Sequence, residues 1–240
     1  MIVHHGKSPF TGEEVVVIAT GLSRPSRNRK TGPMIQLFSL PSGRSPIEVT
    51  KAYRDGETAQ HDVCGTCPLA GFRGCYVSVQ FSVNQVWKAF RAGAYKTLDV
   101  TKLAGKAIRF GSWGEPIVMP LSLVKQLTAK AKTWTAYTHA WREKFAKPYR
   151  QYMMASVESP EGKAQANAEG WRTFRIIRDA SELLADEVLC PAMVKRERPV
   201  TCSTCGLCRG TSTKAKNVAV LSHGSGPAQA SLAEVLEELG

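Results

Sequence analysis

The seven cysteines of this chain fall into two separate groups, and these groups constrain its fold more than any other feature. The first group comprises Cys64, Cys67 and Cys75, with the spacing C-x2-C-x7-C. The second comprises Cys190, Cys202, Cys205 and Cys208, with the spacing C-x11-C-x2-C-x2-C. An odd number of thiols at such tight spacings suits metal binding better than a disulfide framework. The sequence therefore predicts two metal sites.

The two groups predict sites of different kinds. Three thiolates leave one position of a four-coordinate centre open, whereas four thiolates close it. His61 precedes Cys64 closely enough to close the first site as the fourth ligand of a structural zinc. The packed second run is typical of iron–sulfur ligation, although a tetrahedral zinc also accepts four thiolates. The sequence leaves the identity of both metals open.

The length and composition are those of a globular protein. The chain has 240 residues, of which 43% are hydrophobic, enough for one large domain or for a domain with a small appendage. No apolar run approaches the roughly 20 residues of a membrane span, and the N-terminus lacks the apolar core of a secretory signal. We expect a soluble cytoplasmic protein with no membrane partner.

The formal net charge of +12 predicts a basic surface that attracts polyanions. The densest basic cluster is Arg24, Arg27, Arg29 and Lys30. A second cluster, Lys195, Arg196 and Arg198, lies beside the second cysteine group. Because charge alone does not identify a partner, contact with a nucleotide or nucleic acid and a set of solvated loops both remain open.

The hydrophobic pattern predicts an α/β fold with a mainly parallel sheet. Residues 14–20 and 34–40 form the expected N-terminal β-hairpin. From residue 107 onward, strand-like runs alternate with helical ones: AIRFGSW, TWTAYTH, YMMASVES, WRTFRII, EVLCPA and NVAVLSHG are the expected strands. The chain closes with an amphipathic helix, on which Leu232, Val235, Leu236 and Leu239 share one face.

Several expected strands end in polar residues. The carboxyl ends of parallel strands form the functional face of such folds, so these residues should meet in one pocket. His139, flanked by Tyr137, could be a ligand, a proton donor or a substrate contact, or a hydrogen-bonded structural histidine. Ser156, Glu158 and Arg175 could bind a cofactor's ribose or carboxylate, although each could equally be a satisfied polar residue.

The segment AIRFGSWGEP runs from an apolar strand into a glycine-rich turn that carries a carboxylate. Exposed N–H groups of such a turn, together with Glu115, can contact the polar end of a ligand. The alternative is a tight connection between a strand and a helix.

With these motifs the chain resembles the radical S-adenosylmethionine (radical SAM) enzymes. They carry a three-cysteine loop after the first strand of a partial (β/α) barrel and a Gly-Gly-Glu-Pro motif after the second. The resemblance implies that the first cysteine group holds a 4Fe-4S cluster and the second an auxiliary iron–sulfur cluster. It also implies that S-adenosylmethionine is bound beside the residues that match the motif, Ser112, Gly114, Glu115 and Pro116.

That resemblance implies a reaction and a domain organisation. Reductive cleavage of S-adenosylmethionine, fed by an electron donor, would give a 5′-deoxyadenosyl radical that abstracts hydrogen from a substrate, with His139 and Tyr137 as catalytic candidates. The substrate is unknown, and a nucleotide or nucleic acid suits the basic charge. We divide the chain into an N-terminal hairpin and connector (1–60), a radical-SAM-like partial barrel core (61–189), and a cysteine-rich metal-binding segment with the last strand and helix (190–240).

The cysteine spacing is atypical, because the usual family loop is C-x3-C-x2-C. The chain is also similar to a class of uncharacterised phage and bacterial proteins that share CGxCP followed by CYV, YTHxW, MASVxS, GWRTFR and a C-terminal CxxCxxC. The main alternative is a zinc-binding, non-catalytic protein that binds nucleic acid and in which both cysteine groups are structural. A third alternative is a degenerate barrel that kept its metal and lost catalysis.

Overall fold

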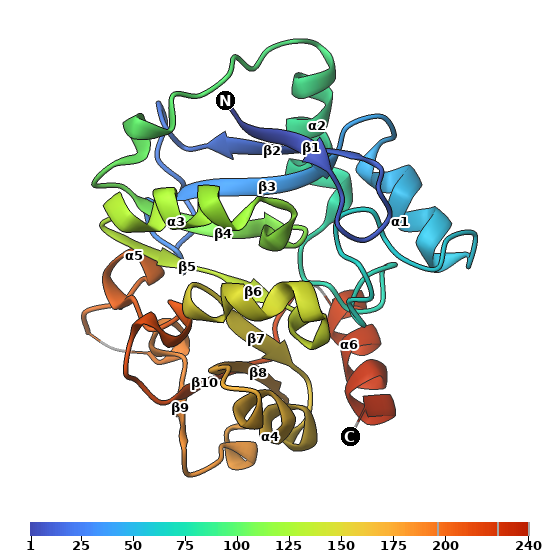
Figure 1. Ribbon diagram of the computed structural model, residues 1–240. Coiled ribbons are helices and arrows are strands. Elements are labelled where there is room, and N and C mark those ends of the chain that lie inside the picture. Colours follow the sequence, from blue (N-terminus) through green and yellow to red (C-terminus); the bar gives the residue numbers. More distant parts are fainter. Residues whose placement is uncertain (196, 225, 240) are drawn as a thin grey trace.

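The computed structural model describes residues 1–195, 197–224 and 226–239, so Arg196 of the second basic cluster lies outside the described residues. Ten strands form two five-stranded sheets, which lie one above the other in Figure 1. The strands are β1 (Ile2–Lys7), β2 (Glu14–Thr20), β3 (Ile35–Pro41), β4 (Ala107–Trp113), β5 (Thr133–Thr135), β6 (Tyr137–Thr138), β7 (Met154–Val157), β8 (Thr173–Ile177), β9 (Glu187–Leu189) and β10 (Asn217–Leu221).

The first sheet is mixed and has the order β1-β2-β3-β4-β5. β2 pairs antiparallel with β1 and with β3, and in the second pairing Val17 lies opposite Ser39. The expected N-terminal hairpin is therefore confirmed, and β1 extends it by one strand. β4 then pairs parallel with both β3 and β5. This half of the sheet carries the turn that begins after Trp113.

The second sheet is parallel throughout and has the order β6-β7-β8-β10-β9. The expected α/β fold with a mainly parallel sheet is confirmed. The strands of the described residues form two open sheets and no closed barrel. A loop with a polar residue follows six of the parallel strands: β3, β4, β6, β7, β8 and β10. A ligand site is therefore expected at the carboxyl ends of these strands.

One extended segment passes from the first sheet into the second. β5 and β6 are separated only by Ala136, whose N–H donates to the carbonyl of Cys208 (3.2 Å) and whose carbonyl accepts from the N–H of Met154 (3.0 Å). The sequence TWTAYTH, expected as a single strand, is therefore divided between two sheets. This junction brings the second cysteine group against the middle of the molecule.

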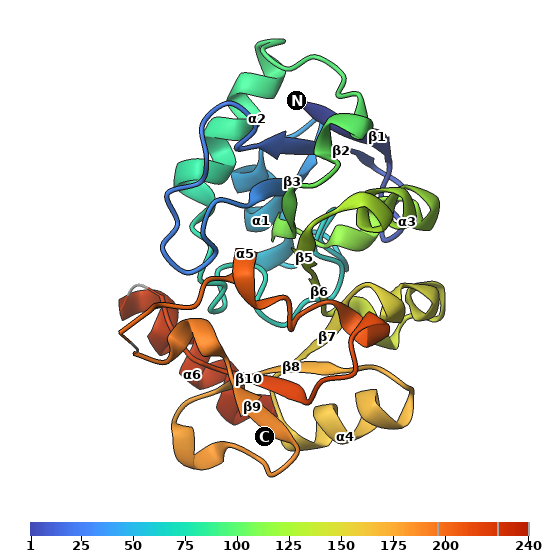
Figure 2. The same cartoon turned by 90° about the vertical axis from the view of Figure 1, so that its left-hand side faces the viewer.

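The helices surround the two sheets (Figures 1 and 2). They are α1 (Pro46–Arg54), α2 (Asn84–Arg91), α3 (Leu121–Lys130), α4 (Pro160–Ala168), α5 (Cys202–Cys205) and α6 (Gly226–Leu239), with 3₁₀ segments and one π-helical segment (Val79–Val83) between them. α1 begins at a capping box, in which Ser45 and Glu48 satisfy each other's backbone N–H groups. Within the described residues, no helix has the length and apolar character needed to cross a membrane.

The C-terminal helix α6 covers the loop of the first cysteine group. Leu232, Val235 and Leu236 are buried there and pack with Leu69 and Cys67. The expected apolar face of this helix is confirmed for these three residues. The fourth expected residue, Leu239, is 44% exposed at the end of the helix. Figure 1 shows α6 beside the segment between α1 and α2. A segment from the far end of the chain thus closes one side of the first site.

Candidate functional site

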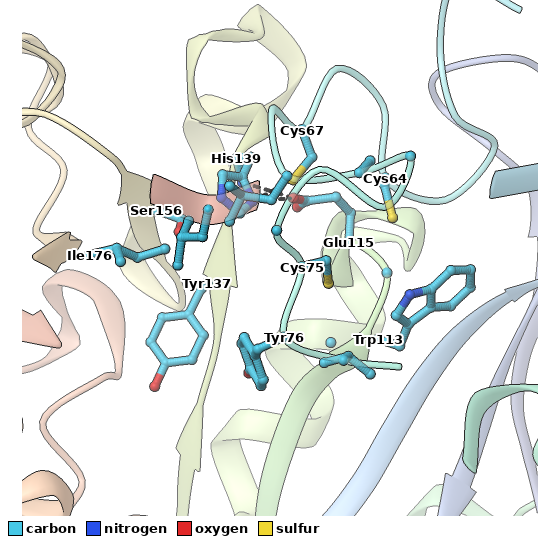
Figure 3. A pocket seen from close by; sticks show the side chains of 18 of the residues that line it. Cys64, Cys67, Cys75, Tyr76, Trp113, Glu115, Tyr137, His139, Ser156 and Ile176 are labelled. Atoms are coloured by element: carbon cyan, nitrogen blue, oxygen red, sulfur yellow. Dashed lines mark hydrogen bonds and ion pairs between the residues drawn. The ribbon is translucent and has the colours of Figure 1, made fainter. Parts of the chain in front are cut away.

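The first cysteine group lines a cavity of about 170 Å³, which we call the cysteine cavity. It lies at the carboxyl ends of β4, β6 and β7, and Figure 3 shows its side chains. The lining includes four residues expected at the site from strand ends and the glycine-rich turn: Ser112, Glu115, His139 and Ser156. The structure thus brings the cysteine loop and the strand-end polar residues into one place.

Short backbone turns shape the cysteine loop. His61 and Gly65 exchange two backbone hydrogen bonds of 2.9 and 2.8 Å, and the N–H of Cys67 donates to the carbonyl of Cys64 (3.1 Å). Gly74 has a φ of +111°, and a Cβ atom there would lie 2.7 Å from the Cα of Leu232. Glycine at this position therefore allows both the turn and the close approach of α6. Its own backbone hydrogen bonds and the contact with α6 therefore both hold the cysteine loop.

Burial favours the protonated form of Cys64 and Cys75 when no metal is bound. Burial, followed by the neighbouring Cys67, raises the pKa of Cys75 to about 11. Burial and the other two thiols raise the pKa of Cys64 well above its usual value. Metal binding at this group would displace protons, because thiolates are the ligands. No group of three or more His, Cys, Asp or Glu side chains in the described residues is arranged to hold a single metal ion.

His61 is held away from the role of fourth ligand. Its Nδ1 accepts from the N–H of Val63 (3.2 Å), so its proton is on Nε2. Nε2 lies 3.3 Å from the hydroxyl of Thr50, which itself donates to the carbonyl of Pro46 (2.6 Å) and is left to accept from the ring. Both ring nitrogens are therefore used, one by the loop and the other by α1. Closure of the first site by His61 would require these bonds to break.

The buried His61 should make stability depend on pH. Burial, with a smaller contribution from Arg44, lowers the pKa of His61 to about 4. The unfolded chain then binds the extra proton between the usual pKa of about 6.5 and pH 4, so stability conferred above pH 6.5 is lost as the pH falls. We expect a loss of about 3 kcal/mol from this group alone over that range.

Urea unfolding of the wild type and of His61→Gln between pH 7 and pH 4 measures this contribution. The carboxylates and the metal ligands titrate in both proteins, so the difference between the two pH profiles isolates His61. Parallel profiles would contradict a buried neutral imidazole.

Glu115 and His139 form the polar centre of the cysteine cavity. Oε1 of Glu115 accepts from the backbone N–H of His139 (2.8 Å), while its buried Oε2 has no hydrogen-bond partner in the described part of the chain. Nδ1 of His139 lies 3.3 Å from the sulfur of Cys67. Burial by itself lowers the pKa of His139, but Cys67 and Glu158 outweigh it and raise that pKa well above its usual value. The ring is suited to donate to a sulfur.

On its other side His139 faces Glu158. Nε2 of His139 and Oε1 of Glu158 are 3.0 Å apart, but their orientation makes no hydrogen bond, and both atoms are buried. Glu158 therefore reaches the site through the histidine rather than by lining the cavity.

The glycine-rich turn after β4 packs against the cysteine loop. The N–H of Glu115 donates to the carbonyl of Val63 at 2.6 Å, and the hydroxyl of Ser112 donates to Oε1 of Gln36 (2.8 Å). Gly114 lines the cavity, whereas Pro116 begins a 3₁₀ turn (Pro116–Val118) outside its lining. The turn is thus a bridge between β4 and the first cysteine group.

Arg175 is placed differently from the other expected residues. Its guanidinium donates to both carboxylate oxygens of Glu187 (2.8 and 2.7 Å) and to the carbonyl of Glu182 (2.7 Å). Both side chains of the Arg175–Glu187 pair are almost fully buried, and Arg175 does not line the cysteine cavity. Its hydrogen bonds hold β8 to β9 and the turn before it.

The second cysteine group lies around a larger cavity of about 510 Å³, which we call the basic cavity. Cys190 and Cys202 line it, while Cys208 is buried against Met154 and Val218. Cys202 and Cys205 lie on the single-turn helix α5. Burial and the neighbouring Cys190 raise the pKa of Cys202 to about 11, so metal binding by this thiol would also displace a proton.

The two cavities share a wall. Both are lined by Tyr76, Tyr137, Phe174, Val220 and His223. Tyr137, expected as a catalytic candidate, packs against Cys208 and stands two residues before His139, which reaches Cys67. The strand β6 therefore links the two cysteine groups.

Three residues of this region were missed in the sequence: Tyr76, Arg109 and Phe174. Arg109 could have been found, because it alternates with Gly111 and Trp113 along β4 and so lies on the same face. Tyr76 directly follows Cys75, which is also a usable signal. Phe174 has no such signal, since nothing in its local sequence separates it from an ordinary strand residue.

No family model, no curated protein and no solved structure matches the chain.

Proposed function

We propose that the protein is an iron–sulfur, S-adenosylmethionine-dependent radical enzyme. Cys64, Cys67 and Cys75 would hold a 4Fe-4S cluster in the cysteine cavity. The proposal is supported by a single cavity, at the carboxyl ends of parallel strands, that is lined by three thiols, a glycine-rich turn and a buried carboxylate. It carries with it a finer description of the fold, in which the strands of residues 61–189, β4 to β9, belong to a partial (β/α) barrel.

The unpaired oxygen of Glu115 is the observation that carries the proposal. A buried carboxylate oxygen with no donor costs free energy unless a ligand supplies one. The amino group of S-adenosylmethionine would be such a donor, and Glu115 lines the same cavity as the three thiols. The donor chemistry fits the cluster, since cysteine thiolates are its usual ligands.

When bound, the cluster and S-adenosylmethionine would supply the radical chemistry, which belongs to the cofactor rather than to the protein. The chain's own residues bind, orient and exclude water. Glu115 positions an ammonium group, and His139 donates a hydrogen bond to the sulfur of Cys67, a contact that tunes the potential of an iron–sulfur centre. α6 shields the cavity from solvent through Leu232.

The second cysteine group would hold an auxiliary metal centre, either an iron–sulfur cluster or zinc. Its four thiols are enough to close such a site without any other ligand. An electron donor is required for the reductive step and would be a separate protein or reductant.

Anaerobic purification followed by iron, sulfide and zinc analysis tests the proposal. We expect a brown protein that contains iron and sulfide and releases 5′-deoxyadenosine from S-adenosylmethionine under reduction. Stoichiometric zinc in both sites, with no cluster after reconstitution, would contradict the proposal and favour a zinc-stabilised protein without catalysis.

Cys64→Ala should abolish cleavage of S-adenosylmethionine, because the first centre would lose one of its three ligands. Cys205→Ala is the matched control, as it removes one thiol from the second group only. We expect both variants to lose part of their iron, but only Cys64→Ala to fall to the background rate of cleavage. Equal cleavage by Cys64→Ala and the wild type would exclude this role for the first group.

A further inference from the structure

The basic cavity carries a charge pattern that the proposed chemistry does not use. Three cationic side chains, Arg29, Lys30 and Arg109, line it, and its described lining contains no carboxylate. Its volume of about 510 Å³ lies within the range of pockets that bind small organic ligands. A cavity of this size and sign is suited to an anionic ligand.

Arg109 is the strongest sign of such a ligand. It projects from β4 at the wall of the basic cavity, and its guanidinium donates to the hydroxyl of Tyr76 (2.6 Å). No carboxylate in the described residues forms an ion pair with it. The half-buried guanidinium has no carboxylate partner among the described residues, and its planar fork matches the oxygens of a phosphate.

The basic loop between β2 and β3 is fixed at the mouth of this cavity. The N–H groups of Cys202 and Ser203, at the start of α5, donate to the carbonyls of Lys30 and Thr31 (3.0 Å each). Oδ1 of Asn28 accepts from the N–H of Lys30 (3.0 Å), which closes a turn. Figure 2 shows this loop, in blue, descending beside α5. Two cations of the basic cluster, Arg29 and Lys30, therefore line a cavity on an ordered loop.

Aromatic rings form the wall that the two cavities share. The rings of Tyr137 and Phe174 lie 4.1 Å apart at 36°, and those of Tyr76 and His223 lie 4.9 Å apart at 37°. Such faces stack with nucleobases. Cations at one end and aromatic faces at the other are the two elements needed to recognise a nucleotide.

We infer that the substrate of this enzyme is a nucleotide, whose phosphate binds Arg109 and Lys30 in the basic cavity and whose base lies against Tyr137 and Tyr76. This inference rests on the proposed function and names its substrate class. The shared wall places the base next to the cysteine cavity, where the reaction would occur. The nucleotide is either free or part of a single strand, since both present the same chemistry.

A competing account is that the cations only offset the charge of the second thiolate group. Lys30 lies close enough to Cys190 and Cys202 for this, and Arg109 lies close to Cys202. Replacing Lys30 or Arg109 by a neutral residue distinguishes the two accounts. Under the inference, ligand binding is lost. Under the competing account, metal binding is lost.

Binding measured by calorimetry on the full-length, metal-loaded protein tests the inference. The probes are a set of 5′-nucleoside monophosphates, the matching nucleosides, S-adenosylmethionine and a ten-nucleotide single strand. We expect at least one monophosphate or the strand to bind at least tenfold more tightly than the nucleosides. Tighter binding of the monophosphate indicates a free nucleotide, and tighter binding of the strand indicates a nucleotide within nucleic acid.

Arg109→Gln and Lys30→Gln should each weaken the binding of the phosphate-bearing probe about tenfold, with metal content unchanged. Lys102→Gln, which removes the same charge from an exposed turn (Val100–Leu103), is the matched control and should bind like the wild type. Equal affinity for nucleosides and monophosphates would overturn the inference, as would variants that lose metal but not the ligand. Because these readouts need no turnover, failure of S-adenosylmethionine cleavage alone would count against the proposed function and not against the nucleotide site.

Discussion

Gly114→Ala is expected to lower the free energy of unfolding by about 2–5 kcal/mol. Gly114 has a φ of +73°, and a Cβ atom at this position would lie 2.7 Å from the carbonyl oxygen of Ser39 and 2.9 Å from its Cβ. The left-handed backbone costs an alanine roughly 1–2 kcal/mol. Overpacking against backbone of the neighbouring strand β3 adds roughly 1–3 kcal/mol. Urea unfolding monitored by circular dichroism measures the sum.

Gly114→Ala should also affect the first cysteine group. Gly114 precedes Glu115, whose N–H bond to Val63 attaches the cysteine loop to the end of β4. Displacement of the turn should therefore also reduce the metal content of the first centre. Gly93→Ala is the matched control, because Gly93 has a similar φ of +71° but nothing within 4 Å of the added Cβ. If Gly93→Ala and Gly114→Ala lower the free energy of unfolding by the same amount, the contact of the added Cβ with Ser39 does not contribute.

Several strands could be predicted from the sequence, because the hydrophobic pattern that favours a strand is local. Alternation and apolar runs correctly predicted β2 and β4. The division of TWTAYTH at Ala136 could not be predicted in this way. It depends on hydrogen bonds to Cys208 and Met154, which are distant in sequence.

The same distinction separates the predictable and unpredictable parts of the site. The meeting of Glu115 and His139 followed from a general rule about the ends of parallel strands. The role of the basic loop did not, because its attachment to α5 joins Lys30 to Cys202 across most of the chain. The partner of Arg175 was equally hidden, since a strand arginine has the same local pattern whether it faces a cavity or a buried glutamate.

Glu187→Ala is expected to destabilise the fold by about 3–5 kcal/mol, because it leaves the guanidinium of Arg175 buried without its carboxylate. The substitution also removes the acceptor of the Leu184 N–H, which donates to Oε2 of Glu187 (3.0 Å). Urea unfolding again provides the measurement. Glu169→Ala removes half of the more exposed Lys147–Glu169 pair and should cost less than about 1 kcal/mol.

A double variant distinguishes a structural arginine from one that binds the cofactor. Arg175→Met combined with Glu187→Met removes both charges and keeps most of the volume, so its stability should exceed that of Glu187→Ala. If Arg175 acts only in the fold, this variant should retain its metal content and its cleavage of S-adenosylmethionine. Loss of cleavage in a stable double variant would instead assign Arg175 to the cofactor, with the pairing to Glu187 breaking when the cofactor binds. The geometry favours the first outcome, because three hydrogen bonds already occupy the guanidinium and direct it away from the cysteine cavity.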